Sequence, residues 1–336
     1  MKALLYDYHV VKRRDLLRSH LTTDWRLASL PDVGDRDRVR GEIADADAFV
    51  GNVFSADLRD AADNLKLIHC IGAGVDGIPP DNVPPGCVVC NVHEHEIPIS
   101  EYIMLAILLS VTRLPEAQAR FRQGEWHGSG RAEGEFHGEA AGKTLGLIGY
   151  GHIGWAVAAR ARAFGMNVIA VTRRPRDEPT LDWCGPIDDL DRLLATSDFV
   201  AVVCPLTDRT RGLLGEAQLR RLKPTAFLIN VARAEIIDEE PLYRALRERW
   251  FAGAALDVWY QYPPKPGVLL HGSRLPFHEL ENVITTPHFA AWTESLIERR
   301  YRRIAENLDR LACGVTLERV VYQAPVGAVH AADARG

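Results

Sequence analysis

A glycine-rich segment carries the clearest chemical signal in the sequence. It reads GYGHIG at residues 149–154, between an apolar run and an alanine-rich stretch typical of a helix. In that context Gly149 permits a tight turn, Gly151 lets the backbone approach a pyrophosphate, and Gly154 allows close packing of helix on strand. The free amides and positive dipole end of the helix N-terminus favour phosphate. The segment predicts a dinucleotide-binding loop.

The residues after the next apolar run bear on which dinucleotide is bound. A sheet that binds NAD usually carries a carboxylate about 20 residues beyond the glycine loop, for the ribose 2′-hydroxyl. Here the run at residues 167–171 leads instead into Thr172, Arg173 and Arg174. Guanidinium groups can pair with a 2′-phosphate, so NADP(H) is favoured, with NAD(H) possible. A plain pair of surface arginines is the alternative.

Short apolar runs alternate with amphipathic stretches along the chain and predict the elements that position these residues. In the first hundred residues, strands are expected at 3–8, 48–53, 67–71 and 87–92, with helices at 15–21, 36–44 and 55–62. A long helix over residues 100–121, with Ser100 as its N-cap, precedes a second series. Its strands are expected at 144–148, 167–171, 199–203, 226–230, 253–256 and 283–285, followed by a helix at 294–313 and a mobile tail from Gln323. This alternation predicts two α/β lobes with parallel sheets.

The composition excludes several classes of protein. The chain has 336 residues, of which 47% are hydrophobic and 25% charged, as in an ordinary globular protein of about two domains. The net charge of −5 offers no basic stripe for nucleic acid. No apolar run reaches the roughly 18 residues of a membrane span. Six cysteines include one CxxC pair, Cys87 and Cys90; because there is no second pair, a structural role is favoured over a zinc site. The cysteine usage also favours a reducing, cytoplasmic location.

Several motifs in order resemble those of the D-isomer-specific 2-hydroxyacid dehydrogenases. Besides the glycine loop, they are GAGVD at 72–76, PLT at 205–207, NVAR at 230–233, ALDV at 255–258 and TPH at 286–288. The resemblance implies two Rossmann-like lobes: a flavodoxin-like substrate lobe of residues 1–98 and 289–336, into which a nucleotide lobe of residues 99–288 is inserted. It also implies a homodimer formed through the helix near Ser100.

The resemblance further implies catalytic and substrate-binding roles. Arg233 would clamp the carboxylate of a 2-keto acid and polarise its carbonyl, because a guanidinium meets two oxygens at once. His288 would give a proton to the carbonyl oxygen and take it back in oxidation, since imidazole titrates near working pH. The backbone of Ala73 and Gly74 would bind the substrate carboxylate.

Cofactor contacts are implied in the same way. Gly151, His152 and Ile153 would cover the pyrophosphate, and Asp257 would hold the nicotinamide carboxamide, a strand-end cap being its alternative role. The other expected contacts are Cys204, Pro205 and Thr210 on the adenosine side, with Val231 and Ala232.

The sequence departs from the family pattern around His288. A Glu usually stands five residues after the Asp257 position as partner of the catalytic His, but here that place holds Tyr262, or Gln261 if the loop slips by one. Formate dehydrogenases of the same superfamily have Gln there. Ala234 replaces a usual Gly, and the bulky Trp292 stands where small residues are common. Tyr262 and Trp292 are therefore expected to contact the substrate.

Two segments leave alternatives open. In HEHE at residues 93–96, a metal site is one interpretation and a polar hinge another, and Glu94 or Glu96 is a possible substitute partner for His288. The loop at residues 265–278 contains Lys265, His271, Arg274 and His278. It is either a solvated basic loop or a site for a second anionic group, such as a phosphonate.

The sequence thus predicts an oxidoreductase that transfers hydride between a nicotinamide cofactor and a small 2-hydroxy or 2-keto acid, with no metal. Its alternatives are irreversible oxidation of a small anion such as formate or phosphite, and a cofactor-sensing interaction protein.

Overall fold

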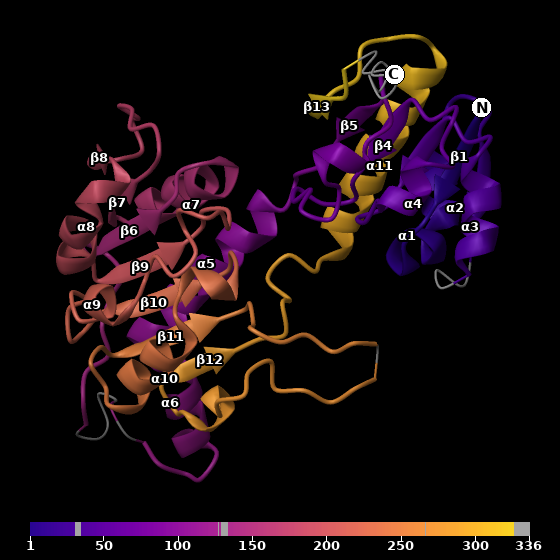
Figure 1. Cartoon of the computed structure of the whole chain (residues 1–336). Helices are drawn as coiled ribbons and strands as arrows, with labels where there is room; N and C mark the ends of the chain where they lie inside the picture. The colour runs from indigo at the N-terminus through magenta and orange to yellow at the C-terminus, as the bar shows by residue number, and fades with distance from the viewer. Residues whose placement is uncertain (31–34, 127, 129–133, 266, 326–336) are drawn as a thin grey trace, which may run out of the picture. The chain divides into compact units, whose positions relative to one another are not determined.

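The computed structural model describes residues 1–30, 35–126, 128, 134–265 and 267–325. The chain divides into two compact units (Figure 1). Unit 1 comprises Met1–Glu94 and Thr293–Gly336, and unit 2 comprises His95–Trp292. The chain therefore leaves unit 1 once, after Glu94, and returns to it at Thr293.

Unit 1 is built on a six-stranded sheet in the order β13-β5-β4-β3-β1-β2. The strands are β1 (Lys2–Leu5), β2 (Arg26–Ser29), β3 (Ala48–Val50), β4 (Leu67–His69), β5 (Val88–Cys90) and β13 (Val320–Gln323). The helices are α1 (Tyr8–Lys12), α2 (Arg14–His20), α3 (Arg36–Ile43), α4 (Ala56–Arg59), η1 (Pro80–Asn82) and α11 (Glu294–Ala312). The first five strands are parallel in the flavodoxin-like order 2-1-3-4-5, as predicted, whereas β13 joins antiparallel to β5.

Unit 2 has a seven-stranded sheet in the order β12-β11-β10-β9-β6-β7-β8. The strands are β6 (Thr144–Ile148), β7 (Asn167–Val171), β8 (Trp183–Gly185), β9 (Phe199–Val202), β10 (Phe227–Asn230), β11 (Gly253–Leu256) and β12 (Val283–Thr285). The helices are α5 (Glu96–Thr112), α6 (Leu114–Phe121), α7 (His152–Ala163), η2 (Ile187–Asp189), α8 (Leu190–Thr196), α9 (Glu216–Leu219), η3 (Ala234–Ile236), α10 (Glu239–Arg247) and η4 (Phe277–Glu279). All pairings are parallel, and the order begins 3-2-1-4-5-6 when counted from β6, which is the Rossmann order. The predicted fold class is confirmed.

The long helix differs from its prediction. It begins at Glu96 rather than Ser100, whose buried hydroxyl donates to the carbonyl of Ile97 at 2.7 Å inside the helix. The helix ends at Arg113, whose backbone is left-handed (φ 51°), and Pro115 lies in the first turn of α6. Proline has no N–H to continue the ladder, so one helix cannot run through this point.

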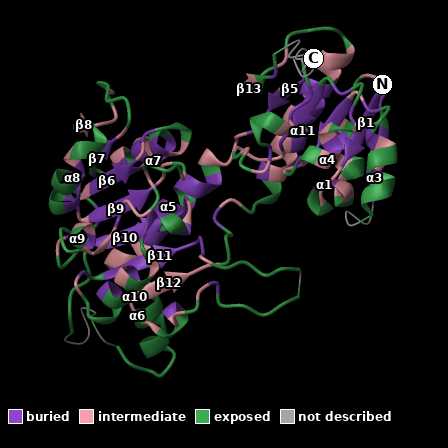
Figure 2. Ribbon diagram, viewed as in Figure 1, coloured by how far each residue is buried: buried purple, intermediate pink, exposed green. Residues whose placement is uncertain are grey.

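Each unit has its own apolar core on both faces of its sheet (Figure 2). Alternate residues of the short strands point to opposite faces, so helices from both sides bury them. Within the described residues, no single helix is long and apolar enough for a membrane span. Only α5 and α6 pass that test as a pair, across a 55° bend.

Candidate active site and cofactor loop

The glycine loop of unit 2 has the shape that the sequence predicts for a phosphate cradle. Gly149 has φ +103°, and a Cβ there would lie 2.8 Å from the backbone N and Cα of Cys204. A Cβ at Gly154 would lie 2.9 Å from the carbonyl oxygen of Gly149. At Gly151, in contrast, an added Cβ would meet nothing within 4 Å. Two glycines are thus required by packing, whereas the third leaves space for another group.

Helix α7 begins directly after this loop, and no side chain caps it at Gly151. Because the N-cap residue is a glycine, it provides no side-chain acceptor for the amides of the first helical turn. A phosphate oxygen is the natural acceptor at such a position. The residues present fit the pyrophosphate of a dinucleotide.

The segment after β7 holds the two predicted arginines. Arg173 and Arg174 are both exposed, and neither forms an ion pair with a carboxylate of the described residues. Arg176, which the sequence analysis did not single out, pairs with Glu178 at 2.6 Å and lies 5.5 Å from the ring centre of Tyr150. Two guanidinium groups at the end of β7 thus remain available to an anion.

The loop after β9 is braced from within. The Thr210 hydroxyl donates to the carbonyl of Pro205 at 2.7 Å and accepts from the amide of Thr207 at 2.7 Å. Cys204 lies under Gly149, and burial raises the pKa of its thiol to about 11. These residues fix the shape of the loop opposite the glycine turn.

Arg233 is held by the turn that follows β10. Asn230, only 2% exposed, accepts from the amide of Ala232 at 3.1 Å and donates to the carbonyl of Arg233 at 3.0 Å. Val231 and Ala232 are buried in this turn. The half-buried guanidinium donates to the Ala232 carbonyl at 2.7 Å and forms no ion pair with any carboxylate that the structure describes. Asn230 therefore positions Arg233, and the guanidinium of Arg233 remains available to bind an anion.

Asp257 organises the loop that carries His288. Its carboxylate, 1% exposed, accepts from the Thr286 hydroxyl at 2.6 Å and from the amides of Phe289 at 2.7 Å and Ala290 at 3.0 Å. These three donors show that Asp257 anchors the loop after β12. An ionised carboxylate has about four acceptor positions, so the expected contact with the nicotinamide carboxamide stays a prediction.

Two further residues that sequence reasoning missed support the same loop. The Tyr102 hydroxyl on α5 lies 2.7 Å from the Thr286 hydroxyl, and the indole of Trp259 donates to the Thr286 carbonyl at 2.8 Å. Of the two, Trp259 had a signal in the sequence, because it directly follows the ALDV motif at residues 255–258. These contacts hold His288 at φ 55°, a conformation that costs energy and that histidine adopts more readily than most residues.

Tyr262, and not Gln261, is the direct partner of His288. Its hydroxyl lies 3.0 Å from Nδ1 of His288 and accepts a longer bond, 3.3 Å, from the amide of Trp259. Desolvation lowers the pKa of His288 below its ordinary value; the Asp257 carboxylate opposes this, and the Arg233 charge adds to it. Burial also raises the pKa of Tyr262. Arg233, His288 and Tyr262 are thus electrostatically coupled within unit 2.

The predicted carboxylate-binding backbone lies in unit 1. The carbonyl of Ala73 accepts from the Asn91 amide group at 2.8 Å, and the carbonyl of Gly74 accepts from the Cys70 thiol at 3.0 Å. The amides of Ala73 and Gly74 donate to no described residue. The loop is therefore anchored through its carbonyls, with its N–H groups left for another acceptor.

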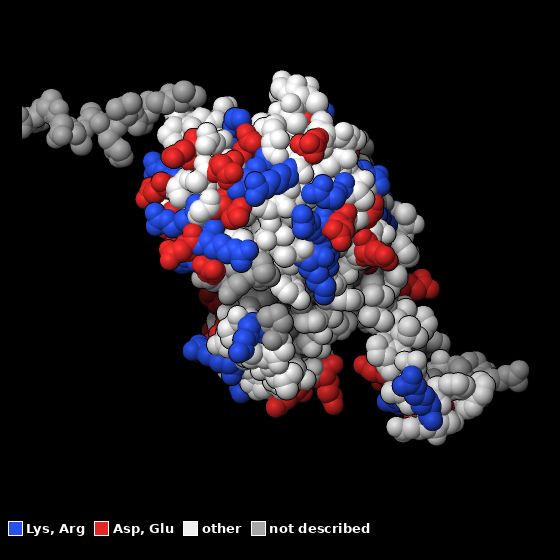
Figure 3. All heavy atoms as spheres, turned by 90° about the vertical axis from the view of Figure 1, so that its right-hand side faces the viewer, with Lys and Arg blue, Asp and Glu red and all other residues white. Residues whose placement is uncertain are grey.

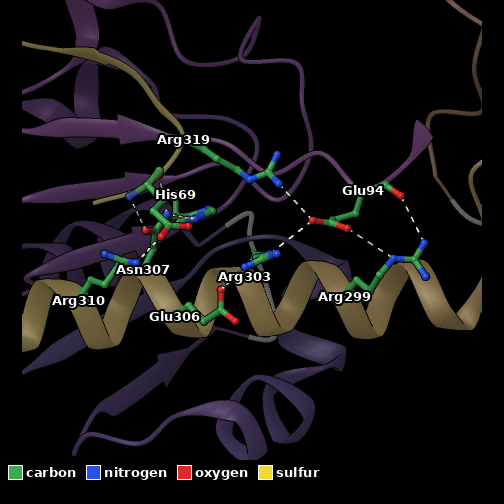
Figure 4. Close-up of polar contacts among 9 residues, drawn as sticks. His69, Glu94, Arg299, Arg303, Glu306, Asn307, Arg310 and Arg319 are labelled. Carbon is green, nitrogen blue, oxygen red and sulfur yellow. Dashed lines mark hydrogen bonds and ion pairs between the residues drawn. The ribbon is translucent and has the colours of Figure 1, made fainter. Parts of the chain in front are cut away.

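Glu94 is committed elsewhere, so it is not a substitute partner for His288. Its carboxylate, with a side chain 13% exposed, lies 3.6 Å from Arg299, 3.4 Å from Arg303 and 3.2 Å from Arg319, all within unit 1 (Figure 4). These ion pairs tie the end of the first chain segment to α11. Glu96 was the other candidate partner of His288, but the hydroxyl of Tyr262 already lies at Nδ1 of that imidazole.

The remaining candidates are placed as follows. Arg274 pairs with Glu239 and Glu240, and the rings of His271 and His278 stack 3.7 Å apart, so this loop offers no uncompensated arginine for a second anion. Trp292 is 52% exposed. Cys87 and Cys90 are buried, and burial raises both thiol pKa values to about 12. Within the described residues, no group of His, Cys, Asp or Glu forms a metal site.

Comparison with known proteins places this geometry in a family. The sequence profile of the NAD-binding domain of the D-isomer-specific 2-hydroxyacid dehydrogenases matches residues 104–290. D-3-phosphoglycerate dehydrogenase of Methanocaldococcus jannaschii is 36% identical over 287 residues, which are 83% of this chain and 52% of that protein, so the chain spans about half of its length. Glyoxylate reductase of Korarchaeum cryptofilum is 34% identical over 271 residues, 79% of this chain and 80% of that protein.

A solved structure agrees over nearly the whole chain. A probable 2-hydroxyacid dehydrogenase from Rhizobium etli, in complex with NADP, HEPES and L(+)-tartaric acid, superposes with a TM-score of 0.74 at 26% identity, covering 96% of this chain and 97% of that one. Sequence profile, relatives and fold agree: the chain belongs to the D-isomer-specific 2-hydroxyacid dehydrogenase family.

Proposed function

We propose that the protein is an NAD(P)-dependent oxidoreductase that interconverts a small 2-hydroxy acid and its 2-keto acid. The observation that carries this proposal is the cluster of Arg233, His288 and Tyr262 on the same unit as the open cradle at Gly151. A free guanidinium beside a hydrogen-bonded imidazole provides a carboxylate clamp and an acid–base group. When bound, the nicotinamide supplies or accepts the hydride.

The chain's own residues divide the remaining work. The guanidinium of Arg233 on unit 2 binds the substrate carboxylate and polarises the adjacent carbonyl. The amides of Ala73 and Gly74 on unit 1 are proposed separately as donors to a substrate carboxylate. Since Nδ1 of His288 faces Tyr262, Nε2 is the nitrogen available to donate a proton to the carbonyl oxygen in reduction. The same nitrogen takes the hydroxyl proton in oxidation. Trp292 lines the substrate side.

Tyr262 makes this acid–base group different from one held by a carboxylate. A phenol donates to Nδ1 of neutral imidazole and accepts from Nδ1–H of imidazolium, whereas a carboxylate only accepts. A neutral partner also adds no Coulomb attraction for imidazolium. Desolvation, which lowers the pKa of His288, therefore favours the neutral imidazole that oxidation requires.

The cofactor is proposed to be NADP(H) in preference to NAD(H). Thr172 stands where a carboxylate would repel a 2′-phosphate, and Arg173 and Arg174 are uncompensated there. The Rhizobium etli relative was solved with NADP. The loop from Cys204 to Thr210, with Val231 and Ala232, would flank the adenosine and nicotinamide portions.

The wider assignments follow from the same family. We propose that unit 2 binds the cofactor and unit 1 the substrate. The boundaries of the units, at residues 94/95 and 292/293, lie within a few residues of the predicted ones at 98/99 and 288/289. We also propose a homodimer, for which the partly exposed α5, with Leu105 at 52%, is a suitable surface. Six free cysteines fit a reducing cytoplasm.

One assay tests the proposed reaction. Purified protein is supplied with NADPH or NADH and a panel of 2-keto acids that includes glyoxylate and a phosphonylated member; formate and phosphite are tested with NADP⁺ or NAD⁺. We expect keto-acid reduction with a lower KM for NADPH, and loss of that preference in Arg173→Ala. Turnover of formate or phosphite alone would favour the anion-oxidising alternative. Cofactor binding without turnover of any substrate would favour a sensing role.

A further inference from the structure

A pocket of about 320 Å³ lies at the open edge of the unit 1 sheet, and neither the glycine loop nor His288 contributes to it. Its floor is formed by β2, from Arg26 to Leu30. Helix α2 provides one wall with Arg14 and Arg18, and α3 provides the other with Arg38 and Glu42. Because Leu17 of α2 packs with Ala3 and Leu5, whereas Val39 of α3 packs with Leu4, the two helices cover opposite faces of the sheet. The pocket therefore straddles the sheet edge.

The backbone of β2 adds donors to this floor. The strand pairs only with β1, and the Arg26 amide donates to the Met1 carbonyl. Since peptide groups alternate along a strand, the N–H groups of Leu27 and Ser29 point away from β1, toward the open edge. The Ser29 hydroxyl lies in the same lining.

The four arginines of the pocket have little compensation from the described acidic side chains; after the Lys2 hydrogen bond, the charge of Arg26 also helps to lower the pKa of Asp45. None of them forms an ion pair with a carboxylate of the described chain, and Arg18 donates only to a backbone carbonyl, that of Trp25, at 3.4 Å. The acidic group in the lining, Glu42, is paired with Lys2 at 2.8 Å, and Lys2 also bonds Asp45. On the face of the molecule that Figure 3 shows, basic and acidic side chains are interspersed. An excess of positive charge thus surrounds a recess lined by backbone donors.

We propose that this pocket binds a small soluble anion that bears two or more phosphate charges. A guanidinium group can donate two hydrogen bonds at once to two oxygens of one phosphate. The backbone amides that face the open edge are further donors to an anion. The volume lies at the lower end of small-molecule sites, which suits a diphosphate group better than a whole dinucleotide. Four guanidinium groups also exceed what a single carboxylate would balance.

The first test maps the site by arginine modification. The full-length protein, saturated with NADPH so that the glycine loop does not compete, is treated with phenylglyoxal in the presence and absence of inorganic pyrophosphate. We expect pyrophosphate to protect Arg14, Arg18, Arg26 and Arg38, while Arg40, exposed on the same α3 but outside the lining, stays reactive. Equal protection of all five, or of none, would overturn the proposal.

Paired variants provide the second test. The double variant Arg26→Gln/Arg38→Gln and the control Arg36→Gln/Arg40→Gln remove the same charge from exposed positions. Pyrophosphate affinity, measured by calorimetry with NADPH present, should fall about tenfold or more in the first and little in the second, because only the first removes charge-assisted hydrogen bonds. Equal losses would indicate diffuse surface attraction and contradict a site. Binding that survives in the first variant would contradict it as well.

Discussion

The imidazole of His288 is desolvated and has the uncharged hydroxyl of Tyr262 as its hydrogen-bond partner, and this gives a pH-dependent prediction. Reduction needs imidazolium, and desolvation lowers the pKa of His288, so the protonated fraction falls as pH rises through a region below the usual value of about 6.5. Keto-acid reduction should therefore fade above that region, while hydroxy-acid oxidation gains. Tyr262→Glu should move the reductive limb of the pH profile to higher pH, because a carboxylate stabilises imidazolium.

A matched control lies one residue away. Gln261→Glu introduces the same charge without the contact to Nδ1, so its reductive limb should shift much less than that of Tyr262→Glu. Both variants are compared by kcat/KM for reduction from about pH 5 to about pH 9, a range that extends to both sides of the usual histidine value of about 6.5. A wild-type reduction rate that stays flat over the whole range would show that His288 is not the proton donor.

Asp257 provides a second prediction at a single residue. Asp257→Asn keeps the shape but removes the charge that raises the pKa of His288, so the reductive limb should move further toward acid. It also weakens bonds to the amides of Phe289 and Ala290, and we expect a loss of about 1–3 kcal/mol in the free energy of unfolding. Thr286→Val is the control, since it removes a bond to Asp257 and leaves the charge. An unshifted limb in Asp257→Asn would mean that the carboxylate does not act on His288.

Among the elements, α11 depends on Glu94 for its attachment to the first segment of unit 1. Arg299 and Arg303 on α11 and Arg319 beyond it share this carboxylate (Figure 4). Glu94→Gln removes the carboxylate of the partly buried Arg299 and Arg319, while Arg303 keeps its pair with Glu306, and it should lower the free energy of unfolding by about 1–3 kcal/mol. The pH profile of reduction should not change, because Glu94 is not the partner of His288.

Glu306→Gln is the control for this prediction. Glu306 pairs with Arg303 at 2.8 Å, but both side chains are more than 40% exposed, so the loss should stay within about 1 kcal/mol. Chemical unfolding of both variants gives the comparison. Equal destabilisation would contradict a special role for Glu94, and a shifted pH profile in Glu94→Gln would reopen its link to His288.

At the scale of the whole molecule, NADPH is expected to stabilise unit 2 through the cradle at Gly151. A ligand at 100 times its Kd stabilises the folded state by about 2.7 kcal/mol, which thermal unfolding detects readily. Gly151→Ala should melt as wild type without NADPH, because the new Cβ meets no protein atom within 4 Å, yet lose most of the NADPH effect. Hydrogen exchange should show protection in β6 and the start of α7.

Gly149→Ala serves as the contrast. Its positive φ and the 2.8 Å approach to Cys204 predict a lower melting temperature even without NADPH. If Gly151→Ala keeps the full NADPH effect, the phosphates do not lie over this glycine, and the proposed position of the cofactor is wrong.

The sequence by itself determined the fold class and six of the seven strands that the structure describes in unit 2. The bounds of β6, β7, β11 and β12 match their predictions, because each is a compact apolar run bounded by polar or turn residues. The strands β2, β8 and β13 were missed; all three lie at sheet edges, where a continuous apolar run is not required, although the edge strand β12 was found. The break at Arg113 was missed as well, although Pro115 was a readable signal.

Only the tertiary structure decided which residues meet. The motif order indicated Arg233 and His288, but Tyr262 and Gln261 could not be distinguished until the loop placed one hydroxyl 3.0 Å from Nδ1. The same holds for Glu94, whose partners lie more than 200 positions away in the sequence. The role of Asp257 as an anchor of its loop depends on the amides of Phe289 and Ala290, which no sequence motif includes. Periodicity and motifs report local constraints along the chain, whereas a side chain's partner depends on which distant segments the fold brings together.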